Sequence, residues 1–137
     1  MKKKYNAMVL SCIDPRFQSI TYNFLNKKKL KGKYSFFSIA GGSIGVTSLK
    51  LKEWHKTFWQ NLEISIKLHG IKKLIVINHQ DCGAAKLINT KKFFNMSIEK
   101  NIHKNSFEKI RRAFKKKYPS LKIETYLMSL RKQAEKF

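Results

Sequence analysis

The chain has 137 residues, a formal net charge of +22 and only two cysteines. This length suits one domain with its own hydrophobic core, residues 1–137, and two cysteines exclude a disulfide-rich secreted scaffold. The basic segment at residues 1–5 precedes an apolar run that is too short for a signal peptide, and no run reaches the roughly 20 apolar residues that span a bilayer. We therefore expect a cytoplasmic protein, with no membrane partner, whose thiols stay reduced.

The basic character is the second feature of the composition. The 30 lysines and arginines far outnumber the 8 aspartates and glutamates, which brings nucleic acid into consideration as a partner. Most of these cations are lysines spread over the whole chain, together with abundant Ile and Asn, so a solvated, lysine-coated surface is the favoured interpretation. A positive field would also attract small anions to any cleft.

Short apolar runs alternate with segments of helical periodicity along the chain. Apolar runs rich in β-branched residues predict buried strands, and apolar residues spaced by about three or four predict helices. The expected strands span residues 6–11, 34–39, 73–78 and 122–130. The expected helices span residues 14–29, 53–69, 84–87 and 105–118. This alternation predicts an α/β fold with one mainly parallel sheet of about four strands, flanked by helices.

Turn and cap residues set the expected boundaries. Pro15 suits the first helical position, where its missing N–H leaves no bond unmade. Gly70 is expected to end the long helix before the third strand. Asn105, followed three residues later by a glutamate, resembles a capping box and predicts the start of the last helix. We expect loops at residues 43–52 and 89–102.

Both cysteines stand at the ends of predicted strands, beside other polar residues. The motif Cys-Ile-Asp-Pro-Arg occupies residues 12–16, and His-Gln-Asp-Cys-Gly occupies residues 79–83. Ligands of parallel sheets gather beyond the carboxyl ends of the strands, so we expect Cys12, His79 and Cys82 to meet there. Two thiolates and one imidazole can hold Zn²⁺ and leave its fourth position open, as catalytic zinc sites do.

Asp14 and Arg16 suit a task beside this metal. Asp14 stands two residues after Cys12, and Arg16 can bind it with a two-pronged hydrogen bond. Held in this way, Asp14 stays ionised and can accept a hydrogen bond from a zinc-bound hydroxide; released, the same carboxylate could occupy the fourth position on the metal. An isolated cysteine is usually a small core residue, and only the joint occurrence of these motifs indicates a metal site.

In these motifs the sequence resembles the β-class carbonic anhydrases, which carry Cys-x-Asp-x-Arg after the first strand and His-x-x-Cys-Gly after the third. The Ala-Gly-Gly turn at residues 40–42 is similar to the Ala-Gly turn of that family, and the order of elements agrees over nearly the whole chain. The resemblance implies a zinc lyase that hydrates carbon dioxide reversibly to bicarbonate and a proton. It also implies a homodimer or a higher homo-oligomer with the active site at an interface.

The resemblance assigns roles to individual residues. It implies zinc ligands at Cys12, His79 and Cys82, catalytic residues at Asp14 and Arg16, and substrate contacts at Ala40, Gly41, Gly42 and Gly83. Two segments depart from the family pattern. Ser38 and Ile39 replace the Arg-Asn pair that usually precedes the Ala-Gly turn, and the aromatic segment from Trp54 to Trp59 has no counterpart.

Three interpretations stay open. The first is a carbonic anhydrase, and the second is a related hydrolase of carbon disulfide or carbonyl sulfide with the same metal ligands. The third is a non-catalytic zinc protein of the same fold that binds nucleic acid or another anionic partner through its lysines. No motif surrounds the remaining histidines, which we expect at the surface: His55, His69 and His103.

Overall fold

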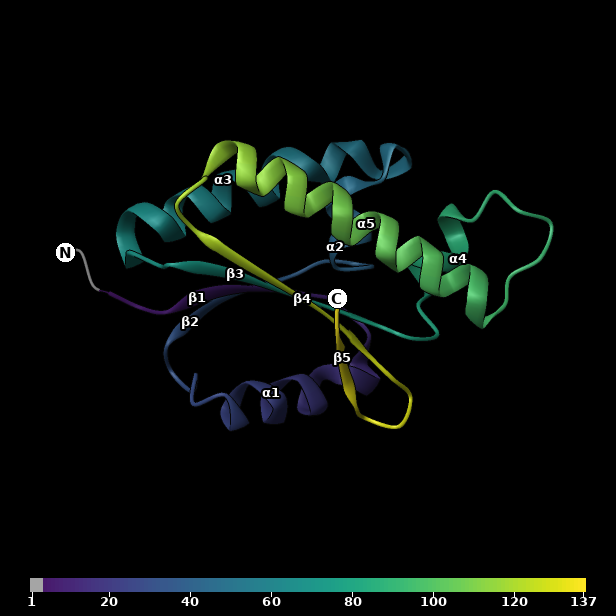
Figure 1. The fold of residues 1–137 in the computed structure, drawn as a ribbon, viewed down its shortest axis with the longest axis horizontal. Coiled ribbons are helices and arrows are strands. Elements are labelled where there is room, and N and C mark those ends of the chain that lie inside the picture. The colour runs from purple at the N-terminus through teal and green to yellow at the C-terminus, as the bar shows by residue number, and fades with distance from the viewer. Residues whose placement is uncertain (1–3) are drawn as a thin grey trace.

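The computed structural model describes residues 4–137, so the first part of the basic N-terminal segment lies outside the described residues (Figure 1). Its centre is a five-stranded sheet in the order β2-β1-β3-β4-β5. The strands are β1 (Ala7–Ser11), β2 (Tyr34–Ser38), β3 (Lys73–His79), β4 (Lys122–Met128) and β5 (Ala134–Lys136). The first four are parallel and β5 is antiparallel to β4, which confirms the predicted α/β class. The short edge strand β5 was not predicted.

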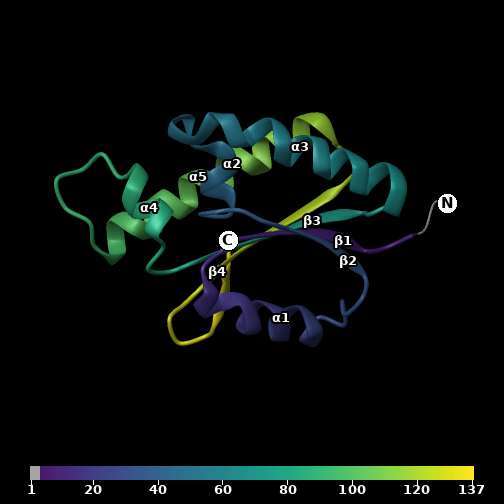
Figure 2. The ribbon, with the colours of Figure 1, turned by 180° about the vertical axis from the view of Figure 1, so that it is seen from behind.

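Helices cover both faces of this sheet (Figures 1 and 2). One face carries α1 alone, the other carries α2, α3 and α5, and α4 lies near the end of β3. The helices are α1 (Gln18–Lys27), α2 (Ser43–Thr47), α3 (His55–Ile64), α4 (Gly83–Ile88) and α5 (Met96–Lys117). Shorter helical segments are the 3₁₀ helices Pro15–Phe17 and Leu49–Trp54 and the π-helix Ser65–His69. Within residues 4–137, no helix combines the length and apolarity needed to cross a membrane.

The residues of β1 alternate between two hydrophobic cores. Ala7 and Val9 pack in the cluster on the α1 side, whereas Met8 and Leu10 pack in the cluster on the α3 and α5 side. Successive side chains of a strand point to opposite faces, so an unbroken apolar run needs cover on both faces. All of β1 is accordingly buried, which fixes the position of the residue that follows it, Cys12.

Several predicted boundaries are confirmed by local contacts. The Asp14 carboxylate accepts a hydrogen bond from the backbone N–H of Arg16 and caps the 3₁₀ helix that Pro15 begins. Gly70 adopts a left-handed conformation with φ of 61° and ends the helical segment before β3. Glycine takes this conformation without the steric cost that other residues carry.

The predicted loop at residues 43–52 is wrong, and the one at residues 89–102 is wrong in its second half. The 43–52 segment forms α2 and most of a 3₁₀ helix. The last helix begins at Met96 rather than Asn105, because the side chain of Asn95 caps it by accepting a hydrogen bond from Ile98 N at 2.9 Å. Helix α5 therefore extends over the second half of the segment that was predicted as loop, and its first turns reach the end of β3.

Candidate metal site

Three potential metal ligands meet at the carboxyl edge of the sheet. Cys12 directly follows β1, His79 is the last residue of β3 and Cys82 directly precedes α4. Strands β1 and β3 are parallel neighbours in the register Ser11 to Ile77, which brings their ends together. The two sulfurs and an imidazole nitrogen all lie within 4.8 Å of one another, and all three residues are buried. The structure thus brings together residues that are about 70 positions apart in the sequence.

The state of the His79 ring fits a metal ligand. Its Nδ1 donates a hydrogen bond to the carbonyl oxygen of Gln80 at 2.7 Å, so Nε2 carries the free lone pair. Nε2 is buried and has no hydrogen-bond partner among the described residues. Buried polar atoms without a partner are uncommon, so the free Nε2 needs an explanation. A metal ion bound by Nε2 and two thiolates would explain it, and zinc prefers this set of ligands. Phe17 stacks on the imidazole with ring centroids 4.2 Å apart, which fixes the ring plane.

The two thiols differ in acidity. The pKa of Cys12 lies well below its usual range, mainly because the Cys82 thiol donates a hydrogen bond to it, and the backbone N–H of Gly41 contributes a further bond at 3.2 Å. The neighbouring Cys12 thiolate and burial raise the pKa of Cys82. Burial would lower the pKa of His79, but the Cys12 sulfur and the Gln80 carbonyl outweigh it and raise the value. A bound divalent cation would displace the remaining protons.

An ion-pair cluster, the exposed clamp, lies beside the three ligands and consists of Asp14, Arg16 and Asp81. Arg16 donates to Asp14 Oδ1 at 3.1 Å from Nε and to Oδ2 at 2.8 Å from Nη2. These bonds lower the pKa of Asp14 to about 2. The Asp14 Oδ2 atom lies 3.8 Å from His79 Nε2, at the edge of the candidate site. The predicted pairing of Asp14 with Arg16 is present, and the catalytic roles of both residues stay a prediction.

Asp81 was not singled out from the sequence, although it stands inside the second motif. Its carboxylate accepts a hydrogen bond from Arg16 Nη1 at 2.9 Å, and its backbone carbonyl accepts one from Nη2 at 3.0 Å. Arg16 therefore connects the segment after β1 to the turn that carries Cys82. Asp81 has a φ of 57°, a conformation that few residues other than glycine adopt.

The predicted glycine turn passes behind Cys12. Gly41 and Gly42 have φ values of 81° and 56°. A Cβ atom on Gly41 would lie 2.8 Å from the Cβ of Ala84, and one on Gly42 would lie 2.6 Å from Asn78 Oδ1. Both positions therefore need glycine for space as well as for conformation.

The other two predicted substrate contacts flank these segments. Ala40 directly precedes the glycine turn and is half-buried. Gly83 directly follows Cys82 as the first residue of α4, and a Cβ atom there would meet nothing within 4 Å. Contact of Ala40, Gly41, Gly42 or Gly83 with a substrate stays a prediction.

A second polar cluster lies behind the ligands and was missed in the sequence. This buried network consists of Ser43, Asn78, Glu99, His103 and Ser106, whose side chains are connected by hydrogen bonds. His103 is fully buried, so its predicted surface position is wrong; His55 and His69 are half-buried. Burial raises the pKa of Glu99, but hydrogen bonds from His103 and from the backbone N–H groups of Cys82 and Asp81 outweigh it, so the pKa is lowered.

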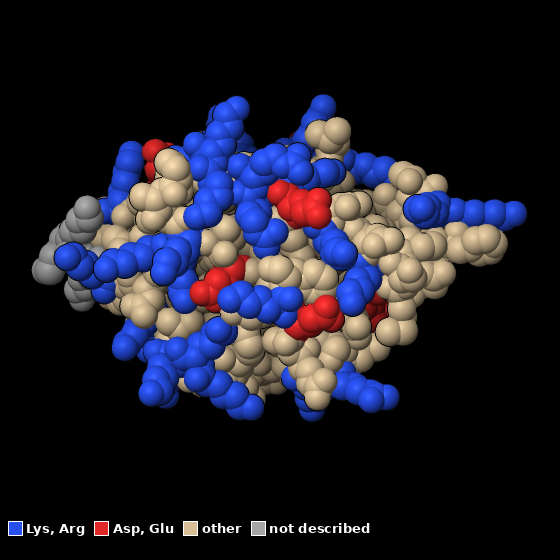
Figure 3. Space-filling view, viewed as in Figure 1, with Lys and Arg blue, Asp and Glu red and all other residues tan. Residues whose placement is uncertain are grey.

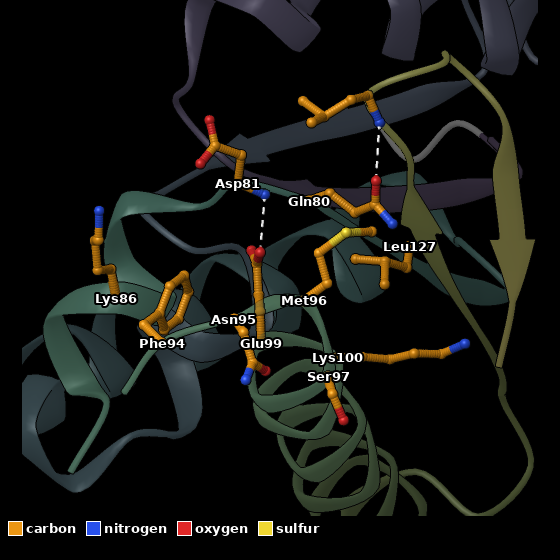
Figure 4. A pocket seen from close by; sticks show the side chains of 11 residues that line it. Gln80, Asp81, Lys86, Phe94, Asn95, Met96, Ser97, Glu99, Lys100 and Leu127 are labelled. Carbon is orange, nitrogen blue, oxygen red and sulfur yellow. Dashed lines mark hydrogen bonds between the residues drawn. The ribbon is translucent and has the colours of Figure 1, made fainter. Parts of the chain in front are cut away.

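Figure 4 shows the Glu99 carboxylate directed from α5 towards the backbone nitrogen of Asp81. These residues line a cavity of about 630 Å³ next to the turn, together with Met96 at the start of α5 and Phe94, which lies beside Lys86 of α4. On the β4 side, the Gln80 side-chain carbonyl accepts a hydrogen bond from Leu130 N at 3.1 Å. The turn after β3 is thus held by contacts from three directions: Arg16, Glu99 and the segment after β4.

Sequence comparisons identify a family and two relatives of this chain. A family model described as "Putative carbonic anhydrase" matches residues 1–134. An uncharacterised protein of Rickettsia bellii is 32% identical over 126 residues, which cover 91% of this chain and 77% of the relative. An uncharacterised protein of Rickettsia conorii is 31% identical over 126 residues, which cover 91% of this chain and 68% of the relative.

The fold is shared with solved β-carbonic anhydrases. The enzyme CafD of Aspergillus fumigatus superposes with a TM-score of 0.67 at 12% sequence identity, covering 97% of this chain and 89% of CafD. One of two tetrameric β-carbonic anhydrases of Sordaria macrospora superposes with a TM-score of 0.65 at 10% identity, covering 98% of this chain and 81% of that one. With its β-class fold and a family match over nearly its whole length, the chain belongs to the carbonic anhydrase family.

Proposed function

We propose that this protein binds one zinc ion and catalyses the reversible hydration of carbon dioxide to bicarbonate and a proton. The observation that carries the proposal is the buried group of Cys12, His79 and Cys82, with ligand atoms within 4.8 Å of one another and an unpaired His79 Nε2. This donor set leaves one position of a tetrahedral ion open, as catalysis requires.

The residues at the site would have distinct roles in this reaction. Cys12, His79 and Cys82 would hold the ion, which when bound supplies a Lewis acid that makes water a nucleophile near neutral pH. The ionised Asp14 carboxylate would accept a hydrogen bond from the reacting water and orient it towards the substrate carbon. Arg16 would keep Asp14 ionised and directed at the site, consistent with the lowered pKa of that carboxyl.

The proposal assigns the whole chain, residues 1–137, to one domain that acts as a homo-oligomer. The tetrameric state of the Sordaria enzymes supports an assembly. Apolar side chains near the site and on the edge strand β2 support it as well, since Ile13 is 58% exposed and Phe36 is 46% exposed. Subunit contacts commonly cover such residues. A cytoplasmic location remains an expectation from the sequence.

The two alternatives make different demands. A carbon disulfide or carbonyl sulfide hydrolase would use the same ligands, so only assays with each substrate separate it from a carbonic anhydrase. Nucleic acid binding would rest on the net charge of +22. On the face seen in Figure 3 the lysines and arginines are interspersed with acidic and uncharged residues, which favours a solvated surface over a dedicated binding stripe.

The test combines metal analysis with stopped-flow hydration of carbon dioxide. We expect about one zinc per chain and a hydration rate above buffer in the parent protein. Asp14→Ala should keep zinc and lose about 10- to 100-fold in turnover, because it removes a carboxylate next to the metal without removing a ligand. Asp14→Asn, which keeps the shape and loses the charge, separates orientation from charge.

Two results would count against the proposal, the first against the activity itself and the second against the role of Asp14. One is a parent protein that binds zinc but hydrates carbon dioxide no faster than buffer while it hydrolyses carbonyl sulfide or binds DNA in a salt-sensitive way. The other is an Asp14→Ala variant as fast as an active parent, which would remove the role given to that carboxylate.

A further inference from the structure

We propose that Glu99 is a positioning residue for the metal site, held in place by His103 and Asn78, and that the buried network controls the placement of both thiolates. The inference rests on the proposed zinc site. It concerns residues outside both sequence motifs, on α5 and at the end of β3.

At one end of the buried network, Glu99 holds the turn that carries Cys82. Its Oε1 accepts the backbone N–H of Asp81 at 3.0 Å, and its Oε2 accepts the backbone N–H of Cys82 at 2.9 Å. Figure 4 shows this carboxylate rising from α5 to the turn. Two adjacent amides bound by one carboxylate fix the orientation of both peptide groups, including the left-handed Asp81.

In the middle of the buried network, the contacts of Asn78 determine which atoms of Asn78 and His103 donate hydrogen bonds and which accept them. Asn78 Oδ1 accepts hydrogen bonds from the N–H and the hydroxyl of Ser43 at 3.0 and 3.1 Å. The Asn78 amide nitrogen therefore donates to His103 Nδ1, at 2.9 Å. This leaves the proton of the neutral ring on Nε2, which donates to Glu99 Oε2 at 3.2 Å. The imidazole of His103 thus orients the carboxylate that holds the turn.

The other end of the buried network lies behind Cys12. Ser43 directly follows the glycine turn, and its contact with Asn78 fixes the backbone there. The N–H of Gly41, in the same turn, donates to the Cys12 sulfur at 3.2 Å. The hydrogen bonds from Ser43 to Cys82 N, together with the short backbone segment from Gly41 to Ser43, therefore connect the contact behind the first thiolate with the turn that carries the second.

The burial of these polar residues indicates a task at the site. Ser43 and His103 are fully buried and Glu99 is 6% exposed, so the buried network is shielded from water. A carboxylate in such a position costs free energy, and apolar residues would pack α5 against the sheet without that cost. The hydrogen bonds of Glu99 are directed at the turn, which explains why a carboxylate is present. Partners of this kind behind metal ligands typically change metal affinity by about 10- to 100-fold.

The test compares Glu99→Gln with Glu108→Gln, an exposed position on the same helix that loses the same charge. In Glu99→Gln the new NH₂ group faces a backbone N–H, so one of the two amides loses its acceptor. We expect zinc affinity, measured by chelator competition, to fall about 10- to 100-fold in Glu99→Gln and to stay within about twofold of the parent in Glu108→Gln.

Two further measurements separate positioning from general stability. The cobalt-loaded protein should show an altered thiolate-to-cobalt absorption in Glu99→Gln, which a purely structural role would not produce. His103→Gln, which can still donate to Glu99, should bind zinc more tightly than His103→Leu, which cannot. Thermal unfolding of the metal-free variants shows how much of each change in zinc affinity comes from a general loss of stability.

The outcomes decide the inference. If folded Glu99→Gln binds zinc as tightly as Glu108→Gln and keeps the parent cobalt spectrum, the inference is wrong. If Glu99→Gln does not fold, equal zinc affinity in His103→Gln and His103→Leu overturns it, and a difference between them supports it. If the parent binds zinc without hydrating carbon dioxide, the proposed function fails while the positioning role of Glu99 stands. A parent that binds no zinc would end both.

Discussion

Two polar clusters contact the same turn, and they differ in exposure. The exposed clamp joins Asp14, Arg16 and Asp81, and the side chains of Arg16 and Asp81 are 49% and 63% exposed. The buried network reaches that turn through Glu99, whose carboxylate is shielded from water. Exposed ion pairs in water are weak and rearrange easily, whereas a satisfied buried network is rigid. The difference indicates two separate roles: the buried network places the metal ligands, whereas the exposed clamp holds the Asp14 carboxylate in a position that can change.

The largest expected effect is the loss of zinc when a proposed cysteine ligand is replaced. Cys12→Ser and Cys82→Ser should both reduce zinc from about one per chain to almost none, because each removes one thiolate from a set of three ligands. Metal analysis after dialysis checks this. A variant that keeps full zinc would show that its cysteine is not a ligand.

A methyl group added at Gly42, next to the buried network, should lower both stability and zinc affinity. Gly42→Ala places a Cβ atom 2.6 Å from Asn78 Oδ1 at a φ of 56°. We expect a loss of about 1–3 kcal/mol in the free energy of unfolding of the metal-free protein, together with weaker zinc binding. Urea denaturation measures the first effect and chelator competition the second.

Gly83→Ala is the matched control for that change. A Cβ atom at Gly83 meets nothing within 4 Å, and the residue lies in the first turn of α4. Alanine is favourable in a helix, so stability should stay within about 0.5 kcal/mol of the parent. Equal losses at both glycines would mean that the contact with Asn78 does not hold the turn.

The smallest effect on turnover is expected at Asp81, the most exposed residue of the exposed clamp. Asp81→Asn removes the exposed ion pair with Arg16, but Arg16 keeps its hydrogen bonds to both oxygens of Asp14. An exposed pair contributes at most about 1 kcal/mol, so turnover should fall by about fivefold or less, and less again at high salt. Stopped-flow hydration at two salt concentrations measures this change. A loss as large as that of Asp14→Ala would contradict this expectation and show that the ion pair with Asp81 matters as much to turnover as the Asp14 carboxylate.

Strands β1 to β4 and the meeting of Cys12, His79 and Cys82 could be predicted from the sequence, because strands and the motifs at their ends leave a local pattern, whereas β5 was missed. Unbroken apolar runs marked β1 and β3, and the polar residues directly after them had to lie at the same edge of a parallel sheet. The first helix was also predictable, since Asp14 and Pro15 carry the cap and the first turn. What these motifs do chemically is a separate matter, which the proposed experiments address.

The buried network was missed for a physical reason. Helical periodicity was sought in apolar residues, but the buried positions in the first half of α5 include Glu99, His103 and Ser106. Because these inward-facing residues are polar, the first half of α5 shows no regular spacing of apolar residues. The helix was therefore expected to begin at Asn105, where that spacing becomes regular. Asp81 was missed because a left-handed aspartate has no mark in the sequence beyond its presence in a turn.

The direct pairing of β1 with β3 has a consequence for how this scaffold can vary. Ser11 and Ile77 are held side by side by the sheet itself, so the closeness of the two motifs does not depend on the length of chain that joins them. Insertions or deletions in the connection between α1 and β2, which enters the sheet at the opposite edge where Tyr34 pairs with Ala7, should leave the spacing of the sulfurs and the imidazole intact. A one-residue deletion inside β1 would instead turn Cys12 to the opposite face and abolish the site.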